Sequence, residues 1–254
     1  MSARSSVLLL LLGGCDLAFG VGGEVEPCEL QAFDSARATD IIPAFRFSVD
    51  WDQRFAVAVL DDGSHAELEL PSGTPRKVDL GPYITLNAAL SPEGDALLYT
   101  SSTEPPVLEG ALRGAPGSWT LEARTPIATF VGTPTADVFG PRRVLARMHM
   151  NDATVQELED DNGTWVPVGG AHDFDSEMPP NLTPNGLTAV FTRRTLTESG
   201  DALEVYGMTR PSMDEWFGTP VKILANGNDE APQLLGHCER LYTIHDGLMR
   251  RYDR

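Results

Sequence analysis

Two segments that lie far apart in the chain have nearly the same sequence pattern. Residues 89–100 and 181–192 both read as a short strand, a Ser/Thr-Pro-x-Gly turn and a second, apolar strand. In such a turn Pro presets the backbone dihedral of the second position, and Gly accepts the positive φ that closes the turn. The two copies are separated by roughly two periods of about 45 residues, which is typical of one propeller blade per period. The repeat therefore predicts an all-β fold built from successive small sheets.

The second copy begins the most complete repeat. It predicts four strands, bounded by Gly, Pro or Asp turns, at residues 180–183, 187–193, 202–208 and 220–224. Four short strands with such turns are the content of one blade. The beginning of this repeat recurs near Ser48, Ser91, Ala136, Thr183 and Leu235. These five starts predict five blades of four antiparallel strands, with six blades as the alternative.

The last blade is expected to borrow a strand from the beginning of the chain. Its predicted second and third strands, at 240–244 and 248–252, come directly before the C-terminus. Residues 28–33 are followed by an acidic loop, a Pro and an inner strand. The predicted outer strand at 220–224 is followed by the same three features, so residues 28–33 match an outer strand. We therefore expect residues 28–33 to pair with Leu248 to Tyr252 and to close the ring, because closure removes an exposed sheet edge.

The first 15 residues have the pattern of a bacterial lipoprotein signal. Arg4 supplies a positive charge, residues 7–12 form an apolar run, and Leu12-Gly13-Gly14-Cys15 resembles a lipobox. The apolar run is shorter than the roughly 20 residues that a membrane span requires. A plain secretory signal, or a frayed terminus with a chance Cys, is the alternative to lipidation of Cys15.

This signal divides the chain into three parts. We expect residues 1–14 to be removed as a signal peptide, residues 15–27 to form the lipidated Cys and a flexible tether, and residues 28–254 to form the propeller. The protein would then be exported, reside in the periplasm or at the outer membrane, and touch the membrane through its lipid anchor alone.

Two further cysteines remain for the folded region. Cys28 and Cys238 form an even pair, and the exported protein would meet an oxidising compartment. A disulfide between them would close a loop of about 210 residues and would stabilise the fold mainly by restricting the unfolded chain. Two free thiols are the alternative.

The charge of the chain restricts its partners. The formal net charge is −18 at pH 7. This argues against nucleic acid, because phosphate binding requires a basic surface. An acidic surface of this kind keeps a protein soluble, and we expect a monomer.

Motifs of catalysis are absent from the sequence. It contains no Gly-x-Ser-x-Gly elbow, no His-Glu-x-x-His, no phosphate loop and no Cys-x-x-Cys. His172, with Asp173 and Asp175 nearby, could contribute to a metal site, although isolated surface histidines explain the pattern better. We therefore assign no catalytic residue and expect a binding protein rather than an enzyme.

Three carboxylates could gather at the central channel. Asp40, Glu177 and Asp229 each stand three positions before a Pro that opens a predicted inner strand, so equivalent blades would place them on one face. Such oxygen ligands could bind Ca²⁺, and two carboxylates about 5 to 10 Å apart could hydrolyse a glycosidic bond. The alternative, which we prefer, is that these acidic residues cap turns and stay solvated.

The repeat resembles that of TolB-type β-propellers, which are Pro-Asp relatives of the WD repeat. Residues 177–186 and 229–234 carry the resemblance most plainly, and Glu93 and Asn185 stand where that family usually has Asp. The resemblance implies a periplasmic or surface scaffold that binds proteins, often without catalysis. It thus predicts a lipid-anchored propeller that binds a protein of the cell envelope. A carbohydrate-binding or carbohydrate-active propeller that uses the channel carboxylates is the alternative.

Overall fold

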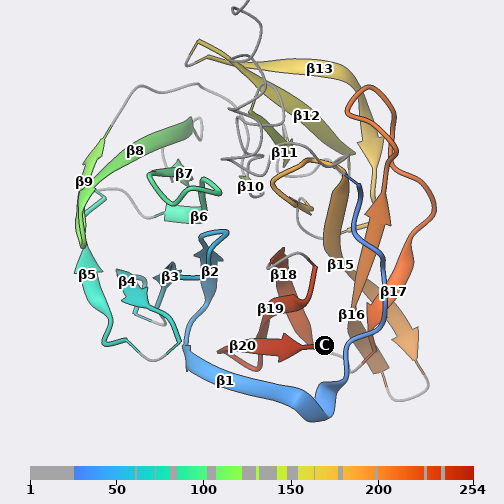
Figure 1. The fold of residues 1–254 in the computed structure, drawn as a ribbon, viewed down its shortest axis with the longest axis horizontal. Coiled ribbons are helices and arrows are strands. Elements are labelled where there is room, and N and C mark those ends of the chain that lie inside the picture. Colours follow the sequence, from blue (N-terminus) through green and yellow to red (C-terminus); the bar gives the residue numbers. More distant parts are fainter. Residues whose placement is uncertain are drawn as a thin grey trace, which may run out of the picture.

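Five four-stranded antiparallel sheets are arranged around a common axis in the computed structural model of this protein (Figure 1). The structure describes residues 26–60, 62–71, 73–80, 85–101, 107–121, 130–131, 142–147, 154–162, 164–176, 180–197, 200–225, 228–235 and 238–254. The prediction of an all-β propeller with five four-stranded blades is confirmed.

The first three blades follow the chain from the inner strand to the outer strand. Blade 1 consists of β2 (Arg46–Val49), β3 (Phe55–Val59), β4 (His65–Glu69) and β5 (Arg76–Val78). Blade 2 consists of β6 (Thr85–Leu90), β7 (Ala96–Ser101), β8 (Val107–Ala115) and β9 (Ser118–Leu121). Blade 3 consists of β10 (Phe130–Val131), β11 (Arg143–Arg147), β12 (Thr154–Asp161) and β13 (Thr164–Asp173).

The last two blades complete the ring. Blade 4 consists of β14 (Asn181–Leu182), β15 (Thr188–Thr197), β16 (Gly200–Thr209) and β17 (Val221–Leu224). Blade 5 consists of β18 (Asp229–Leu235), β19 (Arg240–His245), β20 (Leu248–Asp253) and, as its outer strand, β1 (Ala38–Pro43). Strands β15 and β16 are longer than the repeat predicts, because their pairing continues to Thr197 and Gly200 at the tip of the hairpin.

The hydrophobic core lies between the blades. The described residues form five clusters of buried apolar side chains, and each joins one sheet to its neighbour. One cluster, for example, packs Tyr242 and Met249 of blade 5 against Val49 and Leu68 of blade 1. Because apolar burial favours each of these contacts, every blade is held by the two beside it.

The turn that carries the sequence repeat has the same geometry in three blades. In each, the N–H of the fourth residue donates to the carbonyl of the first at 2.8 to 2.9 Å. The side-chain oxygen of the first residue also accepts the N–H of the residue five positions later, at 2.9 to 3.1 Å. These first residues are Asp50, Ser91 and Thr183, and the fourth residues are Gln53, Gly94 and Gly186. All three fourth residues have φ between 57° and 73°, which explains the preference for Gly.

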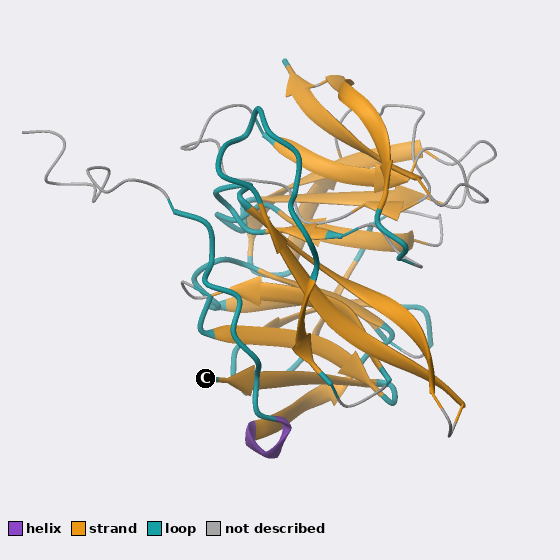
Figure 2. Cartoon of the chain, turned by 90° about the vertical axis from the view of Figure 1, so that its right-hand side faces the viewer, coloured by secondary structure: helices purple, strands orange, loops and turns teal. Residues whose placement is uncertain are grey.

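The ring is closed by a strand from the beginning of the chain, as predicted, but the strand is a different one. Residues 38–43, and not residues 28–33, pair with β20, with Ala38 opposite Tyr252 and Pro43 opposite Leu248. The chain turns after Phe33, because Asp34 caps the 3-10 turn η1 (Ser35–Arg37) by accepting the N–H of Ala36 at 2.9 Å. Figure 2 shows this helical turn in purple, beside the strand that follows it.

Residues 28–33 instead form an irregular strap across the junction of blades 4 and 5. The N–H of Phe33 donates to the carbonyl of Ile223 at 2.8 Å, and the Arg254 guanidinium donates to the carbonyls of Glu29 and Gln31. Leu30 packs closely against Gly207, because a Cβ added to Gly207 would lie only 2.6 Å from the Leu30 side chain. The strap therefore adds to the core of this junction rather than to a sheet.

A disulfide ties the strap to the last blade. It joins Cys28 to Cys238, with the Cα atoms 5.7 Å apart and a sequence separation of 210. Cys238 has a φ of 71°, the same region as the fourth residues of the repeated turns. Among the described residues, no helix is long and apolar enough to cross a membrane.

Gly94 provides a test of the turn. We expect Gly94→Ala to lower the free energy of unfolding by about 1 to 3 kcal/mol more than Gly63→Ala does, because a new Cβ would lie 2.7 Å from two ring carbons of Phe55. Gly63 is the matched control, since it also has a positive φ but has no atom within 4 Å of that position. Urea denaturation of both variants measures the difference, and equal losses would contradict the crowding.

Removing the disulfide tests the strap. We expect a Cys28→Ser/Cys238→Ser double variant to lose about 2 to 5 kcal/mol of stability, because the unfolded chain is no longer cross-linked. Thermal unfolding of oxidised protein, reduced protein and the double variant measures this loss. The reduced protein and the double variant should unfold at similar temperatures, and a variant as stable as the oxidised protein would refute the contribution.

Candidate functional site

The predicted channel carboxylate Asp229 has a structural role. It is 1% exposed, and its carboxylate accepts hydrogen bonds from Thr243 Oγ1 at 2.6 Å and from Tyr252 Oη at 2.8 Å. His245 Nδ1 lies 3.2 Å from its second oxygen. Burial and then the negative Asp229 raise the pKa of Tyr252 to about 12. This cluster joins three strands of blade 5 and leaves Asp229 enclosed.

The other predicted channel residues are not brought together with Asp229. Asp40 lies on the outer strand β1 and accepts a hydrogen bond from Arg250 Nε at 2.6 Å. Two strands, β20 and β19, separate it from β18, which carries Asp229. The expectation that these two carboxylates share the channel face is therefore wrong, because β1 joins the blade as its outer strand. Glu177 lies outside the described residues, as does the predicted lipidation site Cys15.

His172 is part of an aromatic stack rather than of a metal cluster. Its ring lies 3.4 Å from the Trp216 ring, centroid to centroid, and the two planes differ by 16°. Asp173 accepts the N–H of Asp175 at 2.7 Å. Within the described parts of the chain, no group of three His, Cys, Asp or Glu residues is placed to hold a metal ion.

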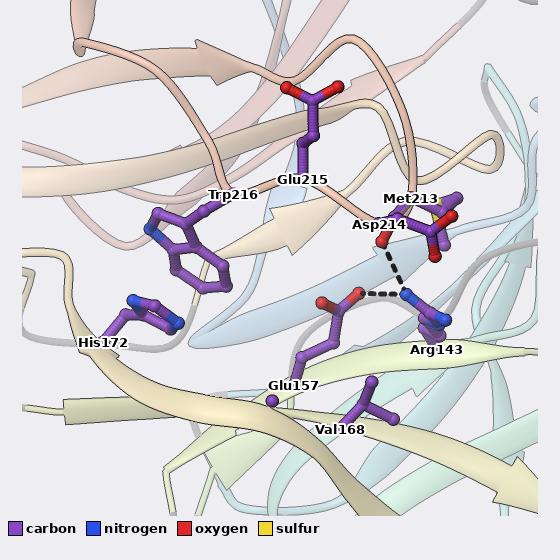
Figure 3. Close-up of a pocket in the computed structure, with 9 residues that line it drawn as sticks. Arg143, Glu157, Val168, His172, Met213, Asp214, Glu215 and Trp216 are labelled. Carbon is purple, nitrogen blue, oxygen red and sulfur yellow. Dashed lines mark hydrogen bonds and ion pairs between the residues drawn. The ribbon is translucent and has the colours of Figure 1, made fainter.

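His172 and Trp216 line a pocket between blades 3 and 4 that the sequence did not predict. The pocket has a volume of about 230 Å³. Strands β11, β12 and β13 form one side, and the loop between β16 and β17 forms the other, as Figure 3 shows. Its lining residues are Arg143, Glu157, Val168, Gly169, His172, Met213, Asp214, Glu215 and Trp216.

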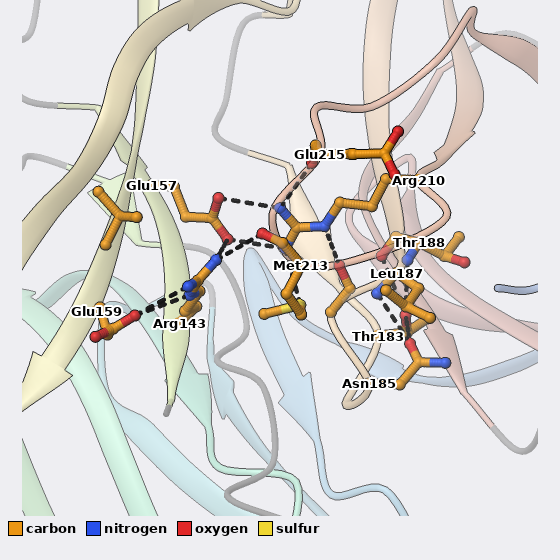
Figure 4. A network of polar contacts seen from close by, with 12 residues as sticks. Arg143, Glu157, Glu159, Thr183, Asn185, Leu187, Thr188, Arg210, Met213 and Glu215 are labelled. Carbon is orange, nitrogen blue, oxygen red and sulfur yellow. Dashed lines mark hydrogen bonds and ion pairs between the residues drawn. The ribbon is translucent and has the colours of Figure 1, made fainter. Parts of the chain in front are cut away.

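A buried ion pair forms the base of this pocket. Glu157 and Arg210 are 4% and 1% exposed, and the guanidinium donates to both carboxylate oxygens, at 2.8 and 3.0 Å. Arg210 Nε also donates to the carbonyl of Gly186 at 2.7 Å, which ties the pair to the repeated turn of blade 4. This bidentate pair, shown in Figure 4, joins the third strand of blade 3 to blade 4.

Arg143 extends the ion pair into a network. Its Nη1 lies 3.8 Å from Glu157 Oε1 and donates to the carbonyl of Met213 at 2.8 Å. Its Nε donates to Glu159 at 3.1 Å. Two arginines thus face two glutamates, so the charges at the base of the pocket balance one another.

The backbone of β13 bulges where it lines the pocket. Val155 is paired with His172, and Glu157 is paired with Val168, so extra residues of β13 face Gln156. The Gln156 amide donates to the carbonyls of Val168 and Gly169, at 3.0 and 3.3 Å, and thereby satisfies acceptors that the ladder leaves open. The bulge sets the positions of Val168 and His172 at the pocket.

The two acidic residues at the edge of the pocket differ from those at its base. Asp214 and Glu215 are exposed, and no described residue forms an ion pair with either. Ser212 Oγ lies 3.4 Å from a carboxylate oxygen of Glu215. In Figure 3 the Glu215 carboxylate points away from Glu157. These carboxylates therefore add negative charge at the opening of the pocket.

The surroundings of His172 disfavour its protonated form. Desolvation lowers the pKa of His172 below its ordinary value, although the nearby charge of Glu157 acts in the opposite direction. The pocket thus combines an aromatic pair, a charge-balanced base and two exposed carboxylates.

The ion pair of the pocket has a counterpart elsewhere in the propeller. Glu67 on β4 is 2% exposed, and Arg113 on β8 of the next blade donates to it from Nε at 3.2 Å. Trp119 Nε1 and the N–H of Gly117 donate to the same carboxylate. Each glutamate lies on the third strand of its blade among other polar residues, and its arginine partner lies 46 or 53 residues away in the sequence. The local sequence therefore gave no signal of these pairs.

Comparisons with known proteins agree with the fold. Neither a family model nor a curated protein matches the sequence. Similar solved structures include a functionally unknown protein from Desulfotomaculum acetoxidans, which is 12% identical with a TM-score of 0.51 over 79% of this chain and 62% of that one. The likeness at this identity concerns the fold alone.

TolB proteins are also among the similar solved structures, as the sequence resemblance predicts. A protein assigned as TolB from Agrobacterium tumefaciens is 14% identical, with a TM-score of 0.48 over 80% of this chain and 69% of that one. TolB from Acinetobacter baumannii is 13% identical, with a TM-score of 0.49 over 84% and 55%. This chain thus spans only part of the length of these proteins.

Neutralising Glu157 tests the ion pair. We expect Glu157→Gln to cost about 3 to 5 kcal/mol of stability, because it leaves the Arg210 charge buried without its partner. The control, Asp201→Asn, removes an exposed pair with Arg194 and should cost no more than about 1 kcal/mol.

A double variant separates the charge from the packing. Glu157→Met/Arg210→Met should recover part of the loss, since it removes both charges together. Urea denaturation gives all three values, and a Glu157→Gln variant no less stable than Asp201→Asn would contradict this account.

Proposed function

We propose that this protein is an exported, lipid-anchored propeller that binds another protein of the cell envelope and performs no catalysis. Cys15 is the anchor, and the surface around the pocket between blades 3 and 4 is the contact surface. The observation that carries the proposal is this pocket, which combines exposed carboxylates with a half-buried aromatic pair.

The size of the pocket favours a protein partner. Pockets for drug-sized ligands measure about 300 to 1,000 Å³, whereas this one has a volume of about 230 Å³. A single anchoring side chain suits this space, and interfaces concentrate their binding energy in such anchors.

The way the chain enters the propeller favours a partner at the membrane. The carbonyl of Glu26 accepts a hydrogen bond from Asn185 Nδ2 at 3.0 Å, and the disulfide at Cys28 follows two residues later. The segment from Cys15 to Glu26 can span at most about 40 Å. A lipid on Cys15 would therefore keep the propeller close to the bilayer, where envelope proteins are concentrated.

Fractionation and site-specific cross-linking test the proposal. The full chain should be found in the membrane fraction, and Cys15→Ser should move it to the soluble fraction. A photo-reactive residue at Asp214 should form an adduct with an envelope protein, whereas the same residue at Asp62, an exposed position on blade 1, should not. Retention of the Cys15→Ser variant would refute the anchor, and equal labelling from both positions would refute the contact surface.

A further inference from the structure

The charges around the pocket between blades 3 and 4 determine whether it favours a cationic or an anionic ligand. Arg143 and Arg210 are matched by Glu159 and Glu157, so the base contributes no excess charge. Asp214 and Glu215 then leave two negative charges at the opening, and the whole chain carries a net charge of −18. A cationic group is favoured there, whereas an anion would be repelled.

The arrangement of the carboxylates argues for an organic cation rather than a metal ion. The described residues include no group of three acidic, His or Cys side chains placed to hold a metal, and the base carboxylate Glu157 is already engaged by Arg210. A guanidinium is planar, spreads its charge over several N–H donors and needs no cage of converging oxygens.

The aromatic pair favours the same group. Trp216 and His172 are half-buried and stack at 3.4 Å, and they form one wall of the pocket. A guanidinium packs on aromatic rings more readily than an ammonium does, because it is planar and weakly hydrated. Desolvation disfavours the protonated form of His172, which limits its repulsion toward a bound cation.

We infer that this pocket binds an arginine side chain presented by the protein partner. The guanidinium lies against Trp216 and His172 and is held by the charges of Asp214 and Glu215, while its aliphatic stem contacts Val168. The inference rests on the proposed function and names the chemistry by which the partner is recognised.

Peptide titration tests this inference. The secreted Cys15→Ser protein is titrated with acetyl-Gly-Arg-Gly-amide, and with the same peptide carrying citrulline or Lys, and binding is followed by NMR. We expect saturable binding of the arginine peptide with shifts at residues 168–172 and 213–216. The neutral citrulline peptide should bind at least about tenfold more weakly, and the Lys peptide should be intermediate.

Matched variants separate a specific site from overall charge. Asp214→Asn/Glu215→Gln should weaken binding of the arginine peptide by about fivefold or more. Asp62→Asn/Glu69→Gln removes the same charge from exposed positions of blade 1 and should leave binding unchanged. Equal weakening by both pairs, equal binding of the citrulline peptide, or shifts elsewhere in the protein would overturn the inference.

The two proposals fail separately. Cross-linking from Asp214 together with no binding of the arginine peptide would overturn the inference and leave the protein-binding surface standing. Binding of the arginine peptide without any adduct from Asp214 would support the pocket and refute the envelope partner.

Discussion

Each blade buries its two faces mainly against the blades on either side, so the fold depends on contacts between sheets that must continue around the whole ring. Five apolar clusters fill the five junctions. An open ring would leave two of these faces in water, and a strand edge would be exposed as well. The pairing of β1 with β20 completes blade 5. Blade 5 packs against both blade 4 and blade 1, so its completion closes the ring.

Polar contacts between blades reinforce the same arrangement. Glu67 with Arg113, and Glu157 with Arg210, place a bidentate ion pair where one blade meets the next. Buried pairs of this kind add little net stability over apolar packing, but they tolerate no loss of one partner. They therefore favour one alignment of adjacent sheets. In the second pair, the same geometry also creates the base of the pocket.

The pocket follows from irregular features on a regular scaffold. The bulge in β13 and the long loop before β17 turn Val168, His172 and Trp216 toward a common space. The ion pair below them needs no ligand, since its charges are balanced. What remains for an incoming group is aromatic surface and exposed carboxylate, which suits recognition rather than proton transfer.

Local patterns along the chain were sufficient to predict the strands of blade 4, the repeated turn and the number of blades. Ser91 and Gly94 act on residues within five positions, so their effects can be derived from the sequence alone. The sequence also indicated a disulfide between Cys28 and Cys238, with two free thiols as the alternative, and the structure contains the disulfide. It further indicated that a strand near the N-terminus closes the ring.

Which N-terminal strand closes the ring was decided only by the tertiary structure. The sequence pattern predicted a strand at residues 28–33 and an acidic loop after it, whereas residues 38–43 form the closing strand. This outcome depends on contacts with residues about 200 positions away. The enclosure of Asp229, the outer position of Asp40 and the pairing of Glu157 with Arg210 have the same origin. Such contacts form between blades or across a whole sheet, and the local sequence carries no information about which distant partner will be adjacent.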